Sequence, residues 1–222
     1  RGLFILALFL LSLNTFAAGS KIDIPKYDWS WKGFFGTYDR ASAQRGLKVY
    51  REVCAGCHSM DLIAYRNLAD LGFSEAHIKA IAAEYLIPDG PNDEGEMFER
   101  EAIPSDRFAN PYPNVQAARA ANNGAYPPDL SLIVKARPKG ADYLKALLLG
   151  YVEAPADKEV PEGQYYNKYM DGNLIAMPSP LSEGIVDYDD GTEATMDQMA
   201  TDVTTFLAWA AEPSLEDRKR IG

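Results

Sequence analysis

Cysteine and histidine are scarce in this chain, which has 222 residues and contains two of each. Two cysteines allow at most one disulfide bridge, so a scaffold held together by several bridges is excluded. A structural zinc site usually takes four Cys or His ligands. Three of these four residues are neighbours, which leaves His77 as the one further candidate. The sequence therefore disfavours a zinc site.

Positive charge is also in deficit, because 22 Lys and Arg face 32 Asp and Glu and give a formal net charge of −10. A nucleic acid is a polyanion and would repel a chain with this charge. The composition therefore argues against nucleic-acid binding and favours a basic partner.

The apolar run at the N-terminus, from Gly2 to Leu13, is too short to cross a bilayer comfortably. It follows Arg1 and precedes small residues, with Thr15 and Ala17 spaced as a signal peptidase requires. We therefore expect residues 1–18 to be a signal peptide. A retained membrane helix and a buried apolar helix are the alternatives.

Both cysteines and one histidine lie in a single stretch, Cys54-Ala55-Gly56-Cys57-His58. The pattern Cys-x-x-Cys-His matches the attachment site of a c-type haem. Its two thiols can reach the two vinyl groups along one porphyrin edge, and the next residue places an imidazole under the iron. The motif predicts one covalent haem with His58 as its proximal ligand. A redox dithiol is the alternative, but it leaves His58 without a role.

The second axial ligand is expected to be a methionine, a soft ligand that raises the reduction potential of electron-carrying cytochromes. His77 instead starts a helix that Ser74 would cap and Pro88 would end, so we expect a surface imidazole there. The candidates are Met60, Met97, Met170, Met177, Met196 and Met199.

Four of these methionines are poor candidates. Met60 is two residues from His58 and lies on the proximal side, whereas Met97 stands among glutamates and looks solvated. Met196 and Met199 share a helical spacing with core residues farther along the chain.

Met170 and Met177 remain. Met170 lies in a turn, Tyr-Met-Asp-Gly, whereas Met177 lies in an apolar segment stiffened by Pro178 and Pro180. Fixed φ angles hold a thioether in place better than a flexible turn does. We therefore favour Met177 as the iron ligand, with simple core packing as its alternative role.

Helical periodicity predicts an all-α core around the haem. Ala43, Leu47, Tyr50 and Cys54 form an apolar stripe leading into the motif, and Gly46 in that helix suggests a close helix crossing. The expected partner is a helix over residues 196–211, which starts at a capping box and carries two large aromatic residues, Phe206 and Trp209.

The middle of the chain is expected to be irregular, because most of the 17 Gly and 14 Pro lie between positions 88 and 191. Two short helices are predicted there, at Asp129–Ala136 and Ala141–Leu149. Arg137 and Tyr143 lie where the connection could offer groups to a haem propionate, although a solvated Arg is the commoner case.

Further strings resemble one family, cytochrome c1, the haem subunit of the cytochrome bc1 complex (quinol–cytochrome c reductase). The resemblance extends from about Asp28 to the C-terminus. The strings are Phe35-Gly36-Thr37-Tyr38-Asp39, Gln44-Arg45-Gly46-Leu47-Lys48-Val49-Tyr50, Cys57-His58-Ser59-Met60, Tyr65-Arg66-Asn67-Leu68, Ala118-Arg119-Ala120-Ala121-Asn122-Asn123-Gly124-Ala125, Pro127-Pro128-Asp129-Leu130-Ser131 and Phe206-Leu207-Ala208-Trp209-Ala210-Ala211-Glu212-Pro213.

The resemblance implies a class I cytochrome c-like haem domain over residues 28–213, with long loop insertions. It implies that Cys54 and Cys57 bear the haem and that His58 and Met177 ligate the iron. It further implies a haem pocket lined by Asn122, Ala125, Tyr126, Pro127, Pro128, Ile133, Arg137, Tyr143, Leu147 and Leu148, with Arg137 and Tyr143 near a propionate.

The resemblance also implies an electron route from a Rieske iron–sulfur protein through this haem to a soluble cytochrome c. Cytochrome b would be a further partner in a dimeric complex on the periplasmic face of a bacterial inner membrane. The intermembrane-space face of the mitochondrial inner membrane is the alternative location. Residues 214–222 would be a basic juxtamembrane segment before a membrane anchor, which family members carry near their C-terminus.

Two other functions remain open at the level of sequence. A monohaem electron carrier outside that complex would need only the haem motif and Met177, but does not explain the length of the chain. A haem enzyme or gas sensor would keep an open position on the iron.

Two acidic runs, Asp89–Glu101 and Asp187–Asp197, have six and five acids respectively. Such runs are usually just solvated, but they could instead steer a basic cytochrome c toward the haem.

Overall fold

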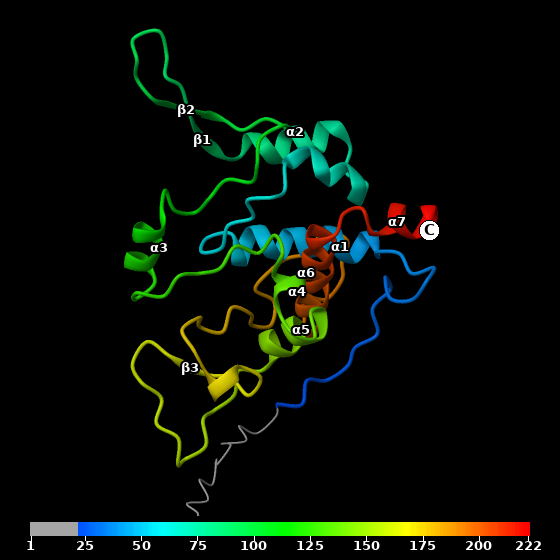
Figure 1. Cartoon of the computed structure of the whole chain (residues 1–222), viewed down its shortest axis with the longest axis vertical. Helices are drawn as coiled ribbons and strands as arrows, with labels where there is room; N and C mark the ends of the chain where they lie inside the picture. Colours follow the sequence, from blue (N-terminus) through cyan, green and yellow to red (C-terminus); the bar gives the residue numbers. More distant parts are fainter. Residues whose placement is uncertain (1–21) are drawn as a thin grey trace, which may run out of the picture.

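The computed structural model describes residues 22–222 and is mainly helical (Figure 1). Its α-helices are α1 (Arg40–Val49), α2 (Glu75–Ala83), α3 (Val115–Ala121), α4 (Ile133–Ala136), α5 (Ala141–Leu149), α6 (Met196–Ala211) and α7 (Leu215–Ile221). A π-helical turn (Tyr50–Cys54) continues α1, and two 3-10 helices span Tyr65–Leu71 and Asp171–Asn173. The prediction of an all-α fold is confirmed, while the predicted signal peptide lies outside the described residues.

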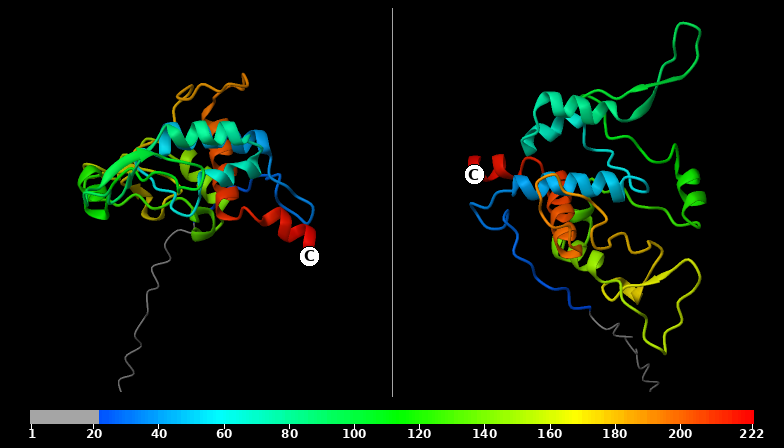
Figure 2. Two further views of the ribbon diagram at one scale, coloured as in Figure 1. Left: turned by 90° about the horizontal axis from the view of Figure 1, so that it is seen from above. Right: turned by 180° about the vertical axis from the view of Figure 1, so that it is seen from behind.

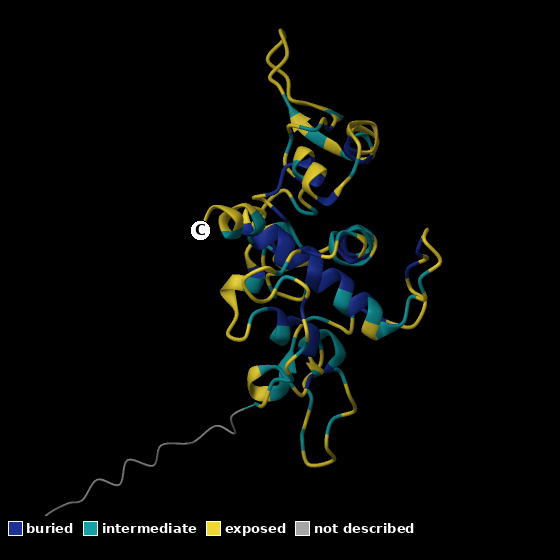
Figure 3. Cartoon of the chain, turned by 90° about the vertical axis from the view of Figure 1, so that its right-hand side faces the viewer, coloured by how far each residue is buried: buried dark blue, intermediate teal, exposed yellow. Residues whose placement is uncertain are grey.

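Two small antiparallel sheets accompany the helices. Strand β1 (Leu86–Asp89) pairs with β2 (Phe98–Glu101), and β3 (Tyr165–Tyr166) pairs with β4 (Leu174–Ile175). The β1–β2 hairpin projects from the body of the molecule and is mostly exposed (Figure 3). The helix before it ends at Ala83 rather than near Pro88, because the chain turns there into β1.

The centre of the core is the crossing of α1 and α6 (Figures 1 and 3). At Gly46, an added Cβ would lie 2.0 Å from the carbonyl oxygen of Asp202 and 2.8 Å from Cβ of Phe206. The close crossing predicted from Gly46 is therefore confirmed. The backbone of Asp202 makes the closest approach, and the Cβ of Phe206, one of the two predicted aromatic residues of this helix, lies beside it.

A buried carboxylate strengthens the same crossing. Asp202 is fully buried and accepts hydrogen bonds from Ser42 Oγ (2.7 Å), Arg45 Nε (2.9 Å) and Gln198 Nε2 (3.0 Å). A buried charge is tolerated when it is paired and hydrogen-bonded in this way. These bonds hold α1 and α6 in one register.

The predicted boundaries of α6 are confirmed, and Thr195 caps the helix by accepting a hydrogen bond from Gln198 N (3.1 Å). Met199 is fully buried and Met196 packs against the core, as predicted. The return bond expected of a capping box is replaced, because Thr195 N donates to Glu193 O (3.0 Å) and the Gln198 side chain donates to Asp202.

The segment before α5 differs from the prediction, because α4 begins at Ile133 rather than at Asp129. Asp129 is drawn away from the helix by hydrogen bonds to the haem-motif loop. The second predicted helix, Ala141–Leu149, is found as α5.

The ends of the described chain lie against the helical core. Asp142 of α5 accepts hydrogen bonds from Trp29 Nε1 (2.7 Å) and Tyr27 N (3.2 Å). Residues 214–222 contain α7, whose Glu216 accepts two hydrogen bonds from Arg40. Within residues 22–222, none of the helices combines the length and apolar character needed to cross a bilayer.

Candidate haem site

The haem motif lies at the end of the helix that crosses α6. Cys54 closes the π-helical turn, and the backbone N–H groups of Cys57 and His58 both donate to Cys54 O, at 3.1 and 2.9 Å. This turn keeps the two thiols close in space and places the imidazole immediately after them. Neither cysteine is in a disulfide, and Cys57 is exposed.

The environment of Cys54 is unsuited to redox dithiol chemistry. Burial, together with the neighbouring Cys57, raises the pKa of the Cys54 thiol to about 12. Reactive cysteines in redox motifs have a lowered pKa, because the thiolate is the nucleophile. The site therefore disfavours the dithiol alternative.

A single hydrogen bond sets the chemistry of His58. Its Nδ1 lies 2.7 Å from the carbonyl oxygen of Pro128, so Nδ1 carries the proton and donates it. Burial lowers the pKa of the imidazole, and the bond to Pro128 opposes that shift. The bond to Pro128 therefore fixes the tautomer that leaves the lone pair of Nε2 available to a metal.

Asp129 fastens the Pro127–Ser131 segment to the haem-motif loop. Its carboxylate accepts hydrogen bonds from Ser59 Oγ (2.9 Å) and from the backbone N–H groups of Asp61 (2.7 Å) and Ser131 (2.8 Å). Leu130 N also donates to Ser59 O at 2.9 Å. These bonds hold Pro128 in place opposite His58, a positioning role that sequence reasoning did not assign to Asp129.

The α3 region reaches the second cysteine through Tyr112. Asn122 Nδ2 donates to Tyr112 Oη (3.1 Å), and that hydroxyl lies 3.9 Å from Cys57 Sγ. Cys57, Tyr112, Tyr126 and Pro127 line a common cavity of about 140 Å³. Tyr112 was not predicted, although its position between two prolines marks it as a rigidly held aromatic residue.

Arg137 lies close enough to Tyr143 for its charge to act on the phenol. Burial raises the pKa of Tyr143, and the nearby positive charge of Arg137 opposes that shift. Arg137 is exposed and makes no ion pair with any residue in the range 22–222. An Arg without an acidic partner beside a phenol hydroxyl suits a haem propionate.

The two methionines left open by the sequence differ in their contacts. Tyr143 Oη lies 3.5 Å from the sulfur of Met170, which engages that thioether. Met177 is half-buried, and Tyr151 Oη donates to its backbone carbonyl oxygen at 3.0 Å, while its sulfur makes no hydrogen bond with residues 22–222. This contrast favours Met177 over Met170 as an iron ligand. Tyr151 was not predicted as a site residue.

Taken together, the residues present fit a haem c. The two thiols and the Nε2 lone pair of His58 are donors of the type that a haem c requires, and Met177 remains the methionine that the sequence favours as the second iron ligand. Ile133 is buried, and Leu148 and Tyr143 pack against the core cluster. Ala125 is half-buried, while Tyr126 and Pro128 are exposed.

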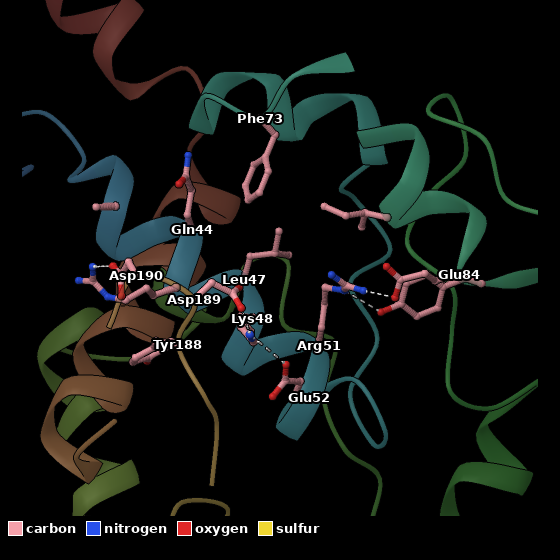
Figure 4. A pocket seen from close by; sticks show the side chains of 14 residues that line it. Gln44, Leu47, Lys48, Arg51, Glu52, Phe73, Glu84, Tyr188, Asp189 and Asp190 are labelled. Atoms are coloured by element: carbon pink, nitrogen blue, oxygen red, sulfur yellow. Dashed lines mark hydrogen bonds and ion pairs between the residues drawn. The ribbon is translucent and has the colours of Figure 1, made fainter. Parts of the chain in front are cut away.

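A larger pocket, of about 690 Å³, lies between α1, α2 and the loop at residues 188–190 (Figure 4). None of the predicted haem-site residues lines it. Its charged groups are paired with one another, including Lys48 with Asp189 (2.9 Å) and Arg45 with Asp190 (2.9 Å). We therefore regard it as a separate feature of the surface.

Among the remaining candidates, His77 and Met97 lie at the surface as predicted. His77 is exposed at the start of α2, where Ser74 Oγ caps the helix, and Met97 is 66% exposed. Met60 is completely buried in the core.

Comparison with known proteins now decides the family, because a model described as "Cytochrome C1 family" matches residues 29–222. The chain belongs to the cytochrome c1 family. Over 217 residues it is 52% identical to "Cytochrome c1 1, heme protein, mitochondrial" of Arabidopsis thaliana, covering 96% of this chain and 71% of that protein. It is 49% identical to "Cytochrome c1" of Rhodospirillum rubrum, covering 90% and 80%.

A third relative has a different length. The chain is 52% identical to "Cytochrome b/c1" of Bradyrhizobium diazoefficiens over 239 residues, which cover 97% of this chain but 35% of that protein. The chain thus spans about a third of this relative. The cytochrome c1 family therefore includes bacterial and mitochondrial members similar to this chain.

Proposed function

We propose that this chain passes electrons from a Rieske iron–sulfur protein, through one haem c, to a soluble cytochrome c. As a cytochrome c1, it is an electron-transfer subunit of a quinol–cytochrome c reductase. The observation that carries the proposal is the family match across residues 29–222. Two features of the haem motif support it: both cysteines are free thiols, and the hydrogen bond from His58 Nδ1 to Pro128 leaves Nε2 available.

Cys54 and Cys57 would hold the haem as thioethers, and His58 and Met177 would ligate its iron. The bound haem would supply a one-electron couple. The protein's part is to fix the geometry and the electrostatics around it. Pro128 orients His58 for coordination through Nε2, and Tyr151 secures the backbone that presents Met177.

Arg137 and Tyr143 would bind a propionate. The apolar side chains of Ile133, Leu147 and Leu148 would exclude water from one face of the ring and so raise its potential. The remaining predicted pocket residues, Asn122, Ala125 and Tyr126, would close the side next to Cys57, where Asn122 holds Tyr112.

The partners follow from the same proposal. Names among the relatives refer to a cytochrome b-c1 complex and to a cytochrome b/c1. For this chain we propose cytochrome b and a Rieske protein as partners in a dimeric complex. The location would be the periplasmic face of a bacterial inner membrane or the intermembrane-space face of the mitochondrial one.

Acidic residues of the β1–β2 hairpin would steer a basic acceptor. Of the six acids between Asp89 and Glu101, Asp89 pairs with Arg100, and the others make no ion pair with residues 22–222. The run Asp187–Asp197 is less suited, because Asp189, Asp190 and Asp197 each pair with a cation at 2.9 Å. The hairpin therefore carries most of the unpaired acids of the two runs.

The proposal is tested by purifying the haem-loaded protein from membranes of its native host and adding a quinol. We expect cytochrome b and a Rieske protein to co-purify, and the haem c to be reduced only while the Rieske protein is present. A haem protein that purifies alone and stays oxidised with quinol would instead be a carrier outside the complex.

A further inference from the structure

A chain of hydrogen bonds leads from helix α3 to the sulfur of Cys57. The side-chain Nδ2 of Asn122 donates to the carbonyl oxygen of Ala118 (2.7 Å) and to Tyr112 Oη (3.1 Å). The hydroxyl of Tyr112 is in turn directed at Cys57 Sγ, at 3.9 Å. These groups are therefore connected in a fixed order that ends at a cysteine of the haem motif.

The direction of each bond follows from the chemistry of its groups. A carbonyl oxygen can only accept, so the bond to Ala118 fixes which side of the Asn122 amide is the NH2 group. That NH2 group can only donate, so it occupies a lone pair of the Tyr112 oxygen. The O–H of Tyr112 is left to donate, and within residues 22–222 the acceptor that it meets is Cys57 Sγ.

Tyr112 is held in place from both sides. Pro111 and Pro113 flank it, and a proline restricts both its own φ and the conformation of the residue before it. Asn114 then caps α3 by accepting a hydrogen bond from Ala117 N (2.9 Å). Figures 1 and 2 show α3 at the outer edge of the molecule, on the side opposite α7. The bonds of Tyr112 therefore join this outer element to the haem motif.

The two cysteines of the motif have different surroundings. Cys54 packs against the core cluster, whereas Cys57 is exposed and lines the cavity of about 140 Å³ that it shares with Tyr112. In the part of the chain that the structure describes, Tyr112 is the one side chain within hydrogen-bond distance of Cys57 Sγ. The hydroxyl therefore acts on the attachment point that faces solvent and not on Cys54.

We propose that Tyr112 is a positioning residue that acts on the haem through the Cys57 sulfur and raises its reduction potential. The positive end of the O–H dipole is directed at the sulfur that attaches the ring. It stabilises the reduced form more than the oxidised form, because reduction adds one negative charge to the haem. Asn122 contributes through Tyr112, since it orients the hydroxyl and polarises it. The inference rests on the haem attachment of the proposed function, but on none of its partners.

The test measures the reduction potential of the haem-loaded protein in Tyr112→Phe, which removes the hydroxyl and keeps the ring. At a fixed ambient potential, the ratio of reduced to oxidised haem should fall by about two- to fivefold, the effect of losing a weak hydrogen bond. The low-spin absorption spectrum should be retained. Tyr165→Phe, which removes an exposed hydroxyl of β3, is the control and should leave the ratio unchanged. An unchanged ratio in Tyr112→Phe, an equal fall in the control, or loss of the low-spin spectrum overturns the proposal.

A double-mutant cycle tests whether Asn122 acts through Tyr112. Asn122→Ala leaves the hydroxyl unoriented and should lower the same ratio by a smaller factor. Adding Asn122→Ala to Tyr112→Phe should then change nothing further, because the hydroxyl through which Asn122 acts is already gone. Additive effects of the two substitutions would mean that Asn122 acts on the haem independently, and would contradict the proposed chain of bonds.

Resonance Raman spectroscopy observes the sulfur itself. Labelling cysteine with a heavy sulfur isotope identifies the carbon–sulfur vibrations of the two thioethers, and Tyr112→Phe should shift one of them and leave the other in place. If neither vibration shifts, the hydroxyl bonds to water rather than to Cys57, and the proposal is wrong. The pyridine haemochrome spectrum separates this result from failure of the proposed function. A protein without covalent haem contradicts both, whereas covalent haem with an unchanged potential in Tyr112→Phe contradicts only the role of Tyr112.

Discussion

The hydrogen bond between His58 and Pro128 shows how a single contact sets the chemistry of one residue. The two residues are 70 positions apart, and their bond of 2.7 Å decides which imidazole nitrogen can bind a metal. Asp129 keeps Pro128 in that place through its bonds to the haem-motif loop. Metal coordination by His58 would therefore depend on a loop that is remote in sequence from the motif.

Replacing Met177 by Leu tests the sixth ligand. We expect the methionine–iron charge-transfer band to disappear and the reduction potential to fall by on the order of 100 mV, because the soft axial ligand is lost. Carbon monoxide should then bind the reduced iron. The control is Met170→Leu, whose sulfur contacts Tyr143 and which should keep the band. A band that survives in Met177→Leu and is lost in Met170→Leu would reverse the assignment.

Tyr151→Phe tests the residue that holds Met177. It removes the 3.0 Å hydrogen bond to the Met177 carbonyl oxygen, which costs about 1 kcal/mol of local stability. The charge-transfer band should therefore be lost at a lower temperature than in the parent protein, while the iron stays low-spin at ambient temperature. Tyr165→Phe, at an exposed tyrosine of β3, is the control and should leave that temperature unchanged. Equal behaviour of the two variants would exclude a positioning role for Tyr151.

At the scale of elements, the crossing of α1 and α6 is what carries the haem motif. Gly46 permits close contact with the backbone of Asp202. The carboxylate of Asp202 in turn accepts hydrogen bonds from Ser42 and Arg45. The π-helical turn that ends at Cys54 continues α1 directly. The packing of α1 against α6 therefore determines where the haem motif lies.

Gly46→Ala should separate the two helices. Alanine favours a helix over glycine by up to about 1 kcal/mol, but its Cβ would lie 2.0 Å from the Asp202 carbonyl oxygen. We expect the clash to dominate and to lower the free energy of unfolding by about 1–3 kcal/mol in a denaturant titration. Ala41→Ser, at an exposed position of α1, should change it by less than about 0.5 kcal/mol. A more stable Gly46→Ala protein would mean that the crossing can relax at little cost.

For the whole molecule, the distribution of charge matters more than its total. Ion pairs with Lys48 and Arg45 occupy acids of the 187–197 run, whereas the β1–β2 hairpin keeps most of its acids free. At the α7 end, Arg218 is paired with Glu212 and Arg220 with Asp217, so the charge there is locally balanced. The unpaired acids of the two acidic runs are therefore concentrated on the hairpin.

Neutralising the hairpin tests steering of the acceptor. Glu94→Gln with Glu96→Gln should lower the association rate with a basic cytochrome c by roughly two- to tenfold at low ionic strength, and weaken its salt dependence. The control removes a paired acid and base together, Asp189→Asn with Lys48→Met, and keeps the net charge. Stopped-flow rates that do not depend on ionic strength, or that fall equally in both variants, would exclude steering by the hairpin.

Local patterns were enough to predict several elements. The apolar stripe, the cap at Thr195 and the glycine crossing depend on residues close in sequence or on steric limits of one residue, so α6 and α5 were located correctly. The start of α4, the end of α2 and the β1–β2 hairpin were missed. At Asp129, a long-range hydrogen bond outweighs helix propensity, so α4 starts later than predicted. At Leu86–Asp89, pairing with β2 outweighs helix propensity, so α2 ends earlier and a strand follows.

The haem motif is recognisable from the sequence, because two thiols and an imidazole at that spacing match the covalent geometry of one porphyrin edge. The family is recognisable in the same way, from strings spread along the chain. The folded structure was needed to assign the roles of Pro128, Tyr112 and Tyr151 and to show which acids stay unpaired. Each of these depends on contacts between residues far apart in the chain, and such contacts exist only once the helices have packed.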